Sequence, residues 1–144
     1  MRLFPLVLLL TAATGSADPP PPQQEPPSEP KNYTATAGVQ PNTVPVGQPA
    51  RLTLTITPQS PWVLKNETPF TAVVTAPQGV SVAKDKLGSK DFQDPKAPAK
   101  SVGTELTASA AGTYTVNAEL TFFVCSSDLC KRQREHLTVQ LTAH

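Results

Sequence analysis

The sequence predicts an all-β domain built as an antiparallel sandwich. Apolar and polar residues alternate in short runs, most cleanly in residues 51–57, where Leu52, Leu54 and Ile56 share one face. Glycine and proline interrupt these runs roughly every 8–12 residues, the spacing of turns in an antiparallel sandwich. No segment shows a helical period of useful length. Alternation and turn spacing together therefore give the fold class.

Residues 1–17 have the form of a secretory signal peptide. One cation, Arg2, precedes a short apolar run, and the small residues Gly15, Ser16 and Ala17 follow it, as a signal-peptidase site requires. The run is shorter than the roughly 20 residues that a membrane helix needs. We therefore expect a secreted or periplasmic protein with no stable membrane insertion after signal removal.

Residues 18–31 form a proline-rich linker, with seven prolines among these positions. Proline cannot donate a backbone hydrogen bond and favours extended polyproline II, so we interpret the stretch as a semi-rigid spacer. A ligand for an SH3-type domain is the alternative, but an exported chain rarely meets such domains. The folded domain should then span residues 32–144.

The charge balance excludes some partners. The chain has 12 Lys and Arg against 11 Asp and Glu, and removal of the signal peptide takes Arg2 away. A mature chain without net charge gives no reason to propose nucleic acid or an anionic membrane as the partner.

The strands can be placed from the alternating runs. They are predicted at residues 51–57, 70–76, 79–83, 102–106, 113–124 and 136–142. The segment 84–100 holds five lysines, three aspartates and two prolines, with only Leu87 and Phe92 as large apolar residues. It is therefore expected to be a long solvated connection.

One local motif narrows the sandwich to an immunoglobulin-like one. Gly112, Tyr114 and Val116 have the spacing of a tyrosine corner, in which a tyrosine opens the penultimate strand and the residue two further on points into the core. Antibody domains have a cysteine at the position of Val116. Because that cysteine is missing here, the sequence predicts the strand arrangement of an immunoglobulin-like sandwich without the antibody disulfide.

The chain has two cysteines, Cys125 and Cys130, separated by a Ser-Ser-Asp-Leu turn. In an exported protein they are expected to pair. If they face each other across a hairpin, counting residues back from Cys125 and forward from Cys130 gives the facing positions of the two strands. Apolar residues then face apolar ones and polar residues face polar ones: Tyr114 with Leu141, Val116 with Val139, Ala118 with Leu137, Thr115 with Gln140, Asn117 with Thr138, and Glu119 with His136. A register shifted by one residue would mix the two faces, so both signals favour this one.

The same count places the disulfide near the surface. Cys125 is out of phase with the core-facing valines, so the pair should lie at the hairpin tip, on the outer face. Lys131 and Arg132 follow at once, and nearby cations stabilise a thiolate, whereas Asp128 opposes this in part. An ordinary solvated strand end is the other interpretation of these charges.

Residues 122–130, followed by a strand at 137–141, resemble the N-terminal periplasmic domain of the thiol–disulfide interchange protein DsbD, and residues 61–69 are similar to an upstream stretch of that family. The resemblance implies an immunoglobulin-like fold and a redox-active pair, Cys125 and Cys130. It implies other exported thiol–disulfide proteins as partners, and an aromatic cap over the disulfide, for which Phe70 and Phe92 are candidates.

Two hypotheses stay open on the sequence. One is a thiol–disulfide exchange module, and the other is a non-enzymatic exported sandwich that binds a partner while its disulfide only staples the hairpin. We expect no cofactor and no metal, because His136 lies about 20 Å from Cys130 along an extended strand. The same distance excludes a cysteine–histidine nucleophile.

Overall fold

The computed structural model describes residue 15 and residues 31–144. The predicted signal peptide, apart from Gly15, and the proline-rich linker up to residue 30 lie outside the described residues. Within the described part, no helix is long and apolar enough to cross a membrane.

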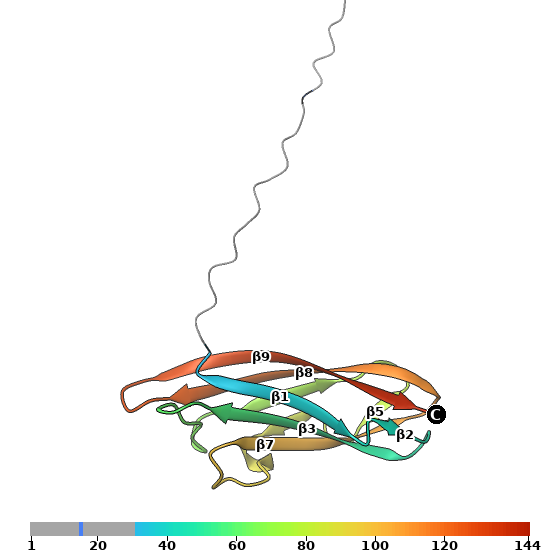
Figure 1. The fold of residues 1–144 in the computed structure, drawn as a ribbon, viewed down its shortest axis with the longest axis horizontal. Helices are drawn as coiled ribbons and strands as arrows, with labels where there is room; N and C mark the ends of the chain where they lie inside the picture. The colour runs from blue at the N-terminus through green and yellow to red at the C-terminus, as the bar shows by residue number, and fades with distance from the viewer. Residues whose placement is uncertain (1–14, 16–30) are drawn as a thin grey trace, which may run out of the picture.

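The domain is a sandwich of two β-sheets (Figure 1). The four-stranded sheet has the order β1 (Tyr33–Gln40), β3 (Pro49–Pro58), β7 (Lys100–Ala108), β5 (Val80–Val82). The five-stranded sheet has the order β2 (Thr43–Val44), β9 (Cys130–Ala143), β8 (Gly112–Cys125), β4 (Thr71–Thr75), β6 (Lys86–Gly88). All pairs are antiparallel except β2 with β9. The predicted immunoglobulin-like antiparallel sandwich is confirmed.

The core lies between the inner faces of the two sheets. The predicted apolar face of β3 is buried, and the even-numbered residues of β8 from Val116 to Val124 are buried opposite it. An aromatic cluster fills one end of this core. The Phe122 ring meets the Tyr33 ring edge-on at 4.9 Å between centroids, and the Phe70 ring meets the Phe92 ring at the same distance. Edge-to-face contacts of this kind add to the stabilisation from burial.

The tyrosine corner is confirmed by its hydrogen bond. Tyr114 Oη donates to the backbone carbonyl of Ala110 at 2.7 Å. Gly79 lies under the same ring in a left-handed conformation with φ of 99°, and a Cβ there would come within 3.3 Å of the Tyr114 ring. The corner therefore depends on a glycine from another loop as well as on its own motif.

Residues 84–100 are not the solvated connection that the sequence predicts. They include β6 and a 3-10 turn, η1 (Ser89–Asp91), and the side chains of Leu87 and Phe92 are buried. Lys100 is buried as well, and its Nζ donates to the carbonyls of Pro95 and, at 2.7 Å, Ala97. The segment folds back because two apolar side chains and one buried ammonium hold it to the domain, while its other lysines stay at the surface.

Strand boundaries differ most at the edges of the sheets. The sequence does not predict β1, β2 or β6, and it begins the last strand at His136 rather than Cys130. Residues 131–135 carry charged or polar side chains because β9 is nearly an edge strand, so its side chains reach water on both faces.

Candidate functional site

The β8–β9 hairpin positions the two cysteines. Its register runs without interruption from Gly112 facing Ala143 to Cys125 facing Cys130. Every predicted pair is present: Tyr114 with Leu141, Val116 with Val139, Ala118 with Leu137, Thr115 with Gln140, Asn117 with Thr138, and Glu119 with His136. The predicted register is confirmed, and the hairpin reaches the tip without a bulge.

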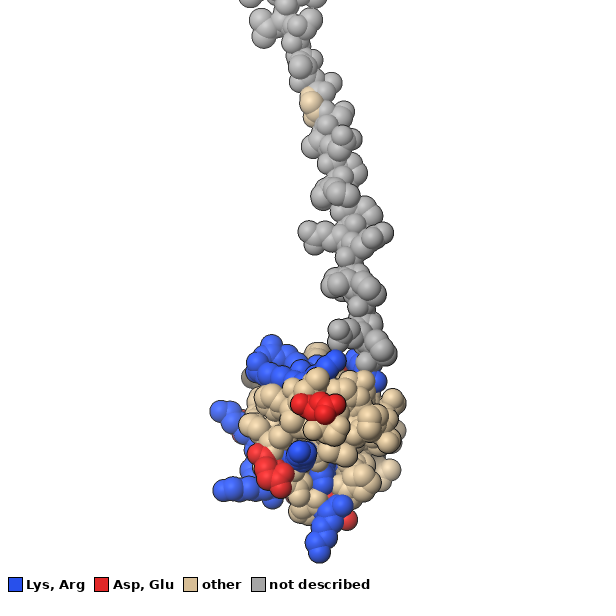
Figure 2. All heavy atoms as spheres, turned by 90° about the vertical axis from the view of Figure 1, so that its left-hand side faces the viewer, with Lys and Arg blue, Asp and Glu red and all other residues tan. Residues whose placement is uncertain are grey.

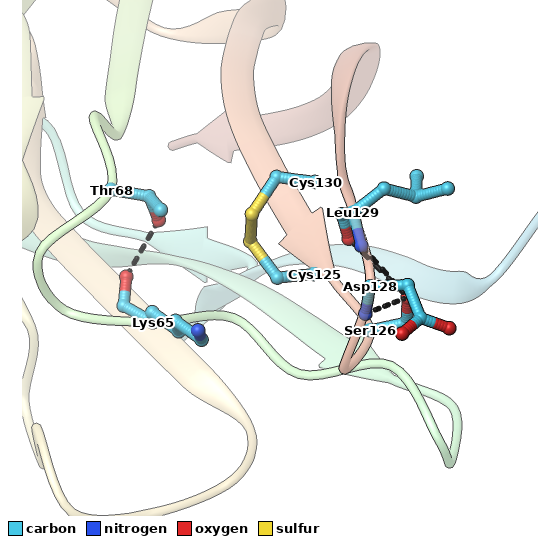
Figure 3. Close-up of a disulfide and its surroundings, with 7 residues drawn as sticks. All are labelled: Lys65, Thr68, Cys125, Ser126, Asp128, Leu129 and Cys130. Atoms are coloured by element: carbon cyan, nitrogen blue, oxygen red, sulfur yellow. Dashed lines mark hydrogen bonds between the residues drawn. A yellow bond between two sulfur atoms is a disulfide. The ribbon is translucent and has the colours of Figure 1, made fainter.

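A disulfide joins Cys125 and Cys130 directly across the hairpin, with 4.0 Å between their Cα atoms (Figure 3). The turn is closed by its own polar groups. The Ser126 amide donates to the Leu129 carbonyl at 2.8 Å, and Ser126 Oγ accepts from the amides of Asp128 and Leu129 at 3.3 Å each. The expected pairing is confirmed, and the tip is tied by hydrogen bonds as well as by the disulfide.

The two cysteines differ sharply in exposure. Cys125 is 0% exposed, whereas Cys130 is exposed. The cause is a third stretch of chain beside β8: the Val63 amide donates to the Cys125 carbonyl, and the Cys125 amide donates to the Val63 carbonyl, both at 2.8 Å. The expectation of a disulfide near the surface is therefore right for Cys130 and wrong for Cys125.

The neighbouring charges divide between the two faces of the hairpin. Lys131 faces Val124 in the ladder, and its Nζ lies 5.5 Å from the centre of the Trp62 ring. Arg132 is exposed and shares the outer face with Cys130, because residues two apart on a strand point the same way. Asp128 lies exposed in the turn. The structure thus brings Arg132, rather than Lys131, to the cysteine face, and their effect on a thiolate stays a prediction.

The aromatic candidates for a cap lie in the core. Phe70 and Phe92 are buried against each other, and Phe70 also approaches Phe122 at 6.3 Å between ring centroids. The residue beside Cys125 is Val63, which is 48% exposed, and the turn adds Leu129, which is 49% exposed. No sequence pattern points to Val63, because it forms an isolated bridge rather than a strand.

The middle of β9 is tied to the start of β1. Glu135 accepts from Lys31 Nζ at 2.6 Å through Oε1 and from Tyr33 Oη at 2.6 Å through Oε2. Burial pushes the pKa of Glu135 upward, but the hydrogen bonds from Lys31 and Tyr33 outweigh it and hold that pKa below its usual value. Burial, together with the Glu135 carboxylate, raises the pKa of Tyr33.

We expect Glu135→Gln to lower the free energy of unfolding at pH 7 and to matter less in acid. A carboxyl whose pKa is lowered by folding stabilises the protein above its unfolded pKa, here 4.5, and loses that contribution as the pH falls through the lower folded value. Urea unfolding of both proteins at pH 7 and pH 3 measures the change. The gap between them should shrink at pH 3, and a constant gap would contradict the assignment. Glu67→Gln, at an exposed carboxylate, is the control and should cost less than about 0.5 kcal/mol.

Other chemistry has little support among the described residues. There, no group of three or more His, Cys, Asp and Glu side chains is placed to hold a metal ion. His136 is exposed and faces Glu119, whose Oε1 lies 3.7 Å from Arg134 Nε. Two shallow depressions lie beside Gln40 at the β1–β3 sheet, and neither is lined by a cysteine.

No protein-family model and no curated protein matches this chain. Several solved structures are similar in fold. A conjugative transposon lipoprotein from Bacteroides eggerthii is 12% identical with a TM-score of 0.45, over 76% of this chain and 96% of that one. The GAE domain of GGA2p from Saccharomyces cerevisiae is 9% identical with a TM-score of 0.43, over 78% and 93%. AggA, the major subunit of aggregative adherence fimbriae type I from Escherichia coli, is 11% identical with a TM-score of 0.40, over 79% and 97%.

These similarities are too weak to carry a functional argument. The fold assignment rests on the strand order of this chain and on its tyrosine corner. The resemblance of the cysteine hairpin to the thiol–disulfide interchange family stays a prediction. What the chain does must be argued from its own residues.

Proposed function

We propose that this protein is an exported, non-enzymatic β-sandwich that binds a protein or cell-envelope partner, and that its disulfide is a structural staple. The observation that carries the proposal is the position of Cys125, which is fully buried, bonded through its backbone to Val63 on one side and through sulfur to Cys130 on the other. The disulfide thus fixes the meeting point of three stretches of chain.

Burial of Cys125 works against thiol exchange. A partner thiolate that attacked the exposed Cys130 sulfur would release the Cys125 sulfur as the leaving thiolate. Burial disfavours the charged form of such a group, and a poor leaving group slows exchange. The geometry therefore favours a disulfide that stays oxidised once it has formed.

A stapled tip suits a binding surface. Val63 and Leu129 are large apolar side chains that are each about half exposed at this end of the molecule. The disulfide and the hydrogen bonds of the turn hold them in place before a partner arrives. Ordering a contact in advance lowers the entropic cost of binding, which is how a small rigid tip contributes to affinity.

An oxidising compartment is part of the proposal. Disulfides persist in secreted and periplasmic proteins and are rare in the cytosol, so a stable cross-strand disulfide supports an extracytoplasmic location. The signal peptide predicted at residues 1–17 would direct the chain there.

The decisive experiment traps the protein in its own cells with a monoalkylating agent and measures the reduction potential of the purified chain. A staple should be recovered fully oxidised, with a potential below about −300 mV. The variants Cys125→Ala and Cys130→Ala leave one thiol each and should form no specific mixed disulfide. A trapped partner on either variant, or a potential near those of exchange proteins, would overturn the proposal.

A second candidate is thiol–disulfide exchange with other exported thiol proteins. The exposure of Cys130, with Arg132 two residues away on the same face, favours it. Exchange would proceed through a mixed disulfide at Cys130, with Cys125 leaving as thiolate. It requires a potential above about −270 mV, in the range of known exchange proteins. The same trapping experiment therefore separates the two candidates.

A further inference from the structure

The outer edge of β9 directs a regular series of backbone groups away from β8. At its C-terminal end, the amide of Thr142 donates to Asn42 at 2.9 Å and that of His144 donates to Val44 at 3.1 Å, so even-numbered residues point outward. At the other end, both backbone groups of Cys125 are bonded to Val63, on the side of β8 away from β9. The facing Cys130 must therefore also point outward, because paired residues share the pattern.

The unbroken register extends this pattern to the residues between. Arg132, Arg134, His136, Thr138 and Gln140 all direct their N–H and C=O groups outward. Only β2 pairs with this edge, at Thr142 and Ala143. No described strand pairs with the rest of it, and Figure 1 shows β9 along the border of the sandwich, with β2 only near its end.

The free edge carries positive charge. Arg132 and Arg134 are exposed on the outer face, and Glu119 Oε1 lies 3.7 Å from Arg134 Nε with both side chains more than half exposed. Figure 2, which looks at the hairpin end, shows blue side chains gathered along the upper border, where β9 lies in Figure 1. An acidic segment would meet complementary charge here.

The inner side of the same edge is apolar at Leu137 and Val139, whereas Gln133 and Glu135 precede them on that side and Glu135 is held by Lys31 and Tyr33. Leu137 and Val139 are half-buried and pack against the core from the inner face of β9. An added strand would therefore meet the arginines on one face and, beside Leu137 and Val139, apolar side chains on the other. This two-sided character selects a segment that alternates carboxylates with apolar residues.

We propose that the edge of β9 from Arg132 to Gln140 binds an extended acidic segment of a partner protein as an added strand. The inference rests on the proposed binding function and names its partner class. The segment's backbone pairs with the five outward residues, its carboxylates lie beside Arg132 and Arg134, and its apolar residues lie beside Leu137 and Val139. Backbone pairing supplies affinity and the alternating side chains supply specificity.

A second copy of this chain is a poorer occupant. Charged side chains on an edge strand protect it from pairing with its own kind, and two such edges side by side would bring their arginines together. An acidic strand removes that repulsion. The same cations therefore exclude one partner and select the other.

The test uses the isotope-labelled, oxidised mature chain and a synthetic peptide of about nine residues that alternates glutamate and valine. Hydrogen exchange followed by NMR reports each outward amide separately. Saturating peptide should slow exchange at Arg134, His136 and Thr138 by about tenfold or more. A peptide with lysine in place of glutamate should leave these amides unprotected.

Two double variants distinguish the effect of positive charge at the β9 edge from the effect of the protein's total charge on peptide binding. Arg132→Ser with Arg134→Ser should weaken peptide binding at least about tenfold. Lys90→Ser with Lys96→Ser removes the same charge from exposed positions elsewhere and should leave the affinity unchanged. His136→Pro deletes one outward amide that pairs with no described strand, and should weaken binding with all charges of Arg and Lys kept.

Three results would overturn the proposal. They are no protection at saturating peptide, equal protection by the lysine peptide, and protection that grows with protein concentration when no peptide is present. The last would make the edge a contact between copies of this chain. The hydrogen-exchange assay uses only the oxidised protein and no thiol, so a negative result contradicts only the docking edge. The trapping experiment tests separately whether the disulfide is structural.

Discussion

Replacing Phe122 by alanine should lower the free energy of unfolding by about 3–5 kcal/mol. The side chain is 0% exposed, and its ring centroid lies 4.9 Å from that of Tyr33 and 6.3 Å from that of Phe70. Truncation would remove these contacts and leave a cavity that the two flanking rings cannot fill without moving. Urea unfolding followed by tryptophan fluorescence measures the loss.

The next residue supplies a matched control. Phe123 is the same amino acid on the same strand, but it is only half-buried and faces Arg132 on the outer side of the sheet. We expect Phe123→Ala to cost about 1 kcal/mol. Equal losses at the two positions would contradict the assignment of the faces.

The Phe122 ring also connects the core to the β9 edge. It packs on Tyr33, whose hydroxyl donates to Glu135 in the middle of β9. Glu135 in turn holds Lys31, where the described domain begins. The strand that we propose as a docking edge is therefore fixed to the core by one aromatic contact and one partly buried carboxylate, which keeps its outward groups in line for an added strand.

The hairpin could be predicted from the sequence because two independent constraints act on it. Both strands alternate over many residues, and the cysteine pair allows one register only, the one in which Val116 faces Val139. The tyrosine corner was accessible for a similar reason, since the bond from Tyr114 to Ala110 joins residues four apart in the chain. Features formed by residues close together in the chain can therefore be recognised from sequence spacing.

Features that depend on distant partners left no such pattern. Burial of Cys125 results from Val63, which joins β8 by a single bridge far away in the sequence. Lys100 is buried because two carbonyls and the Phe92 ring receive its ammonium, although a lysine is normally taken as a surface residue. β1 alternates threonine with small residues such as Ala35 and Ala37, so its apolar face is too weak to recognise.

The cysteine motif that resembles the interchange family does not by itself distinguish a redox-active disulfide from a structural one. A Cys-x4-Cys turn between two strands is compatible with exchange or with stapling, since both need the same covalent geometry. What separates them is the surroundings of each sulfur, and these depend on Val63 and on the exposure of Cys130. The motif therefore predicted which residues form the disulfide, while the burial of each sulfur bears on its chemistry.

Removing the disulfide should cost about 2 kcal/mol, since it closes a loop of only a few residues. The asymmetry of burial makes a sharper prediction for two variants of identical composition. One carries Cys125→Ser with Cys130→Ala, and the other carries Cys125→Ala with Cys130→Ser. Both lack the disulfide and have the same atoms, so any difference in stability reports where the hydroxyl lies.

The variant with serine at 125 should be the less stable by about 1–3 kcal/mol. Its hydroxyl would lie at a position that is 0% exposed, where the flanking backbone groups are already bonded to Val63, whereas at position 130 it would reach water. Urea unfolding of both variants under reducing conditions measures the gap. Equal stabilities would mean that the tip opens once the disulfide is gone, so that Val63 covers Cys125 only because the staple holds it there.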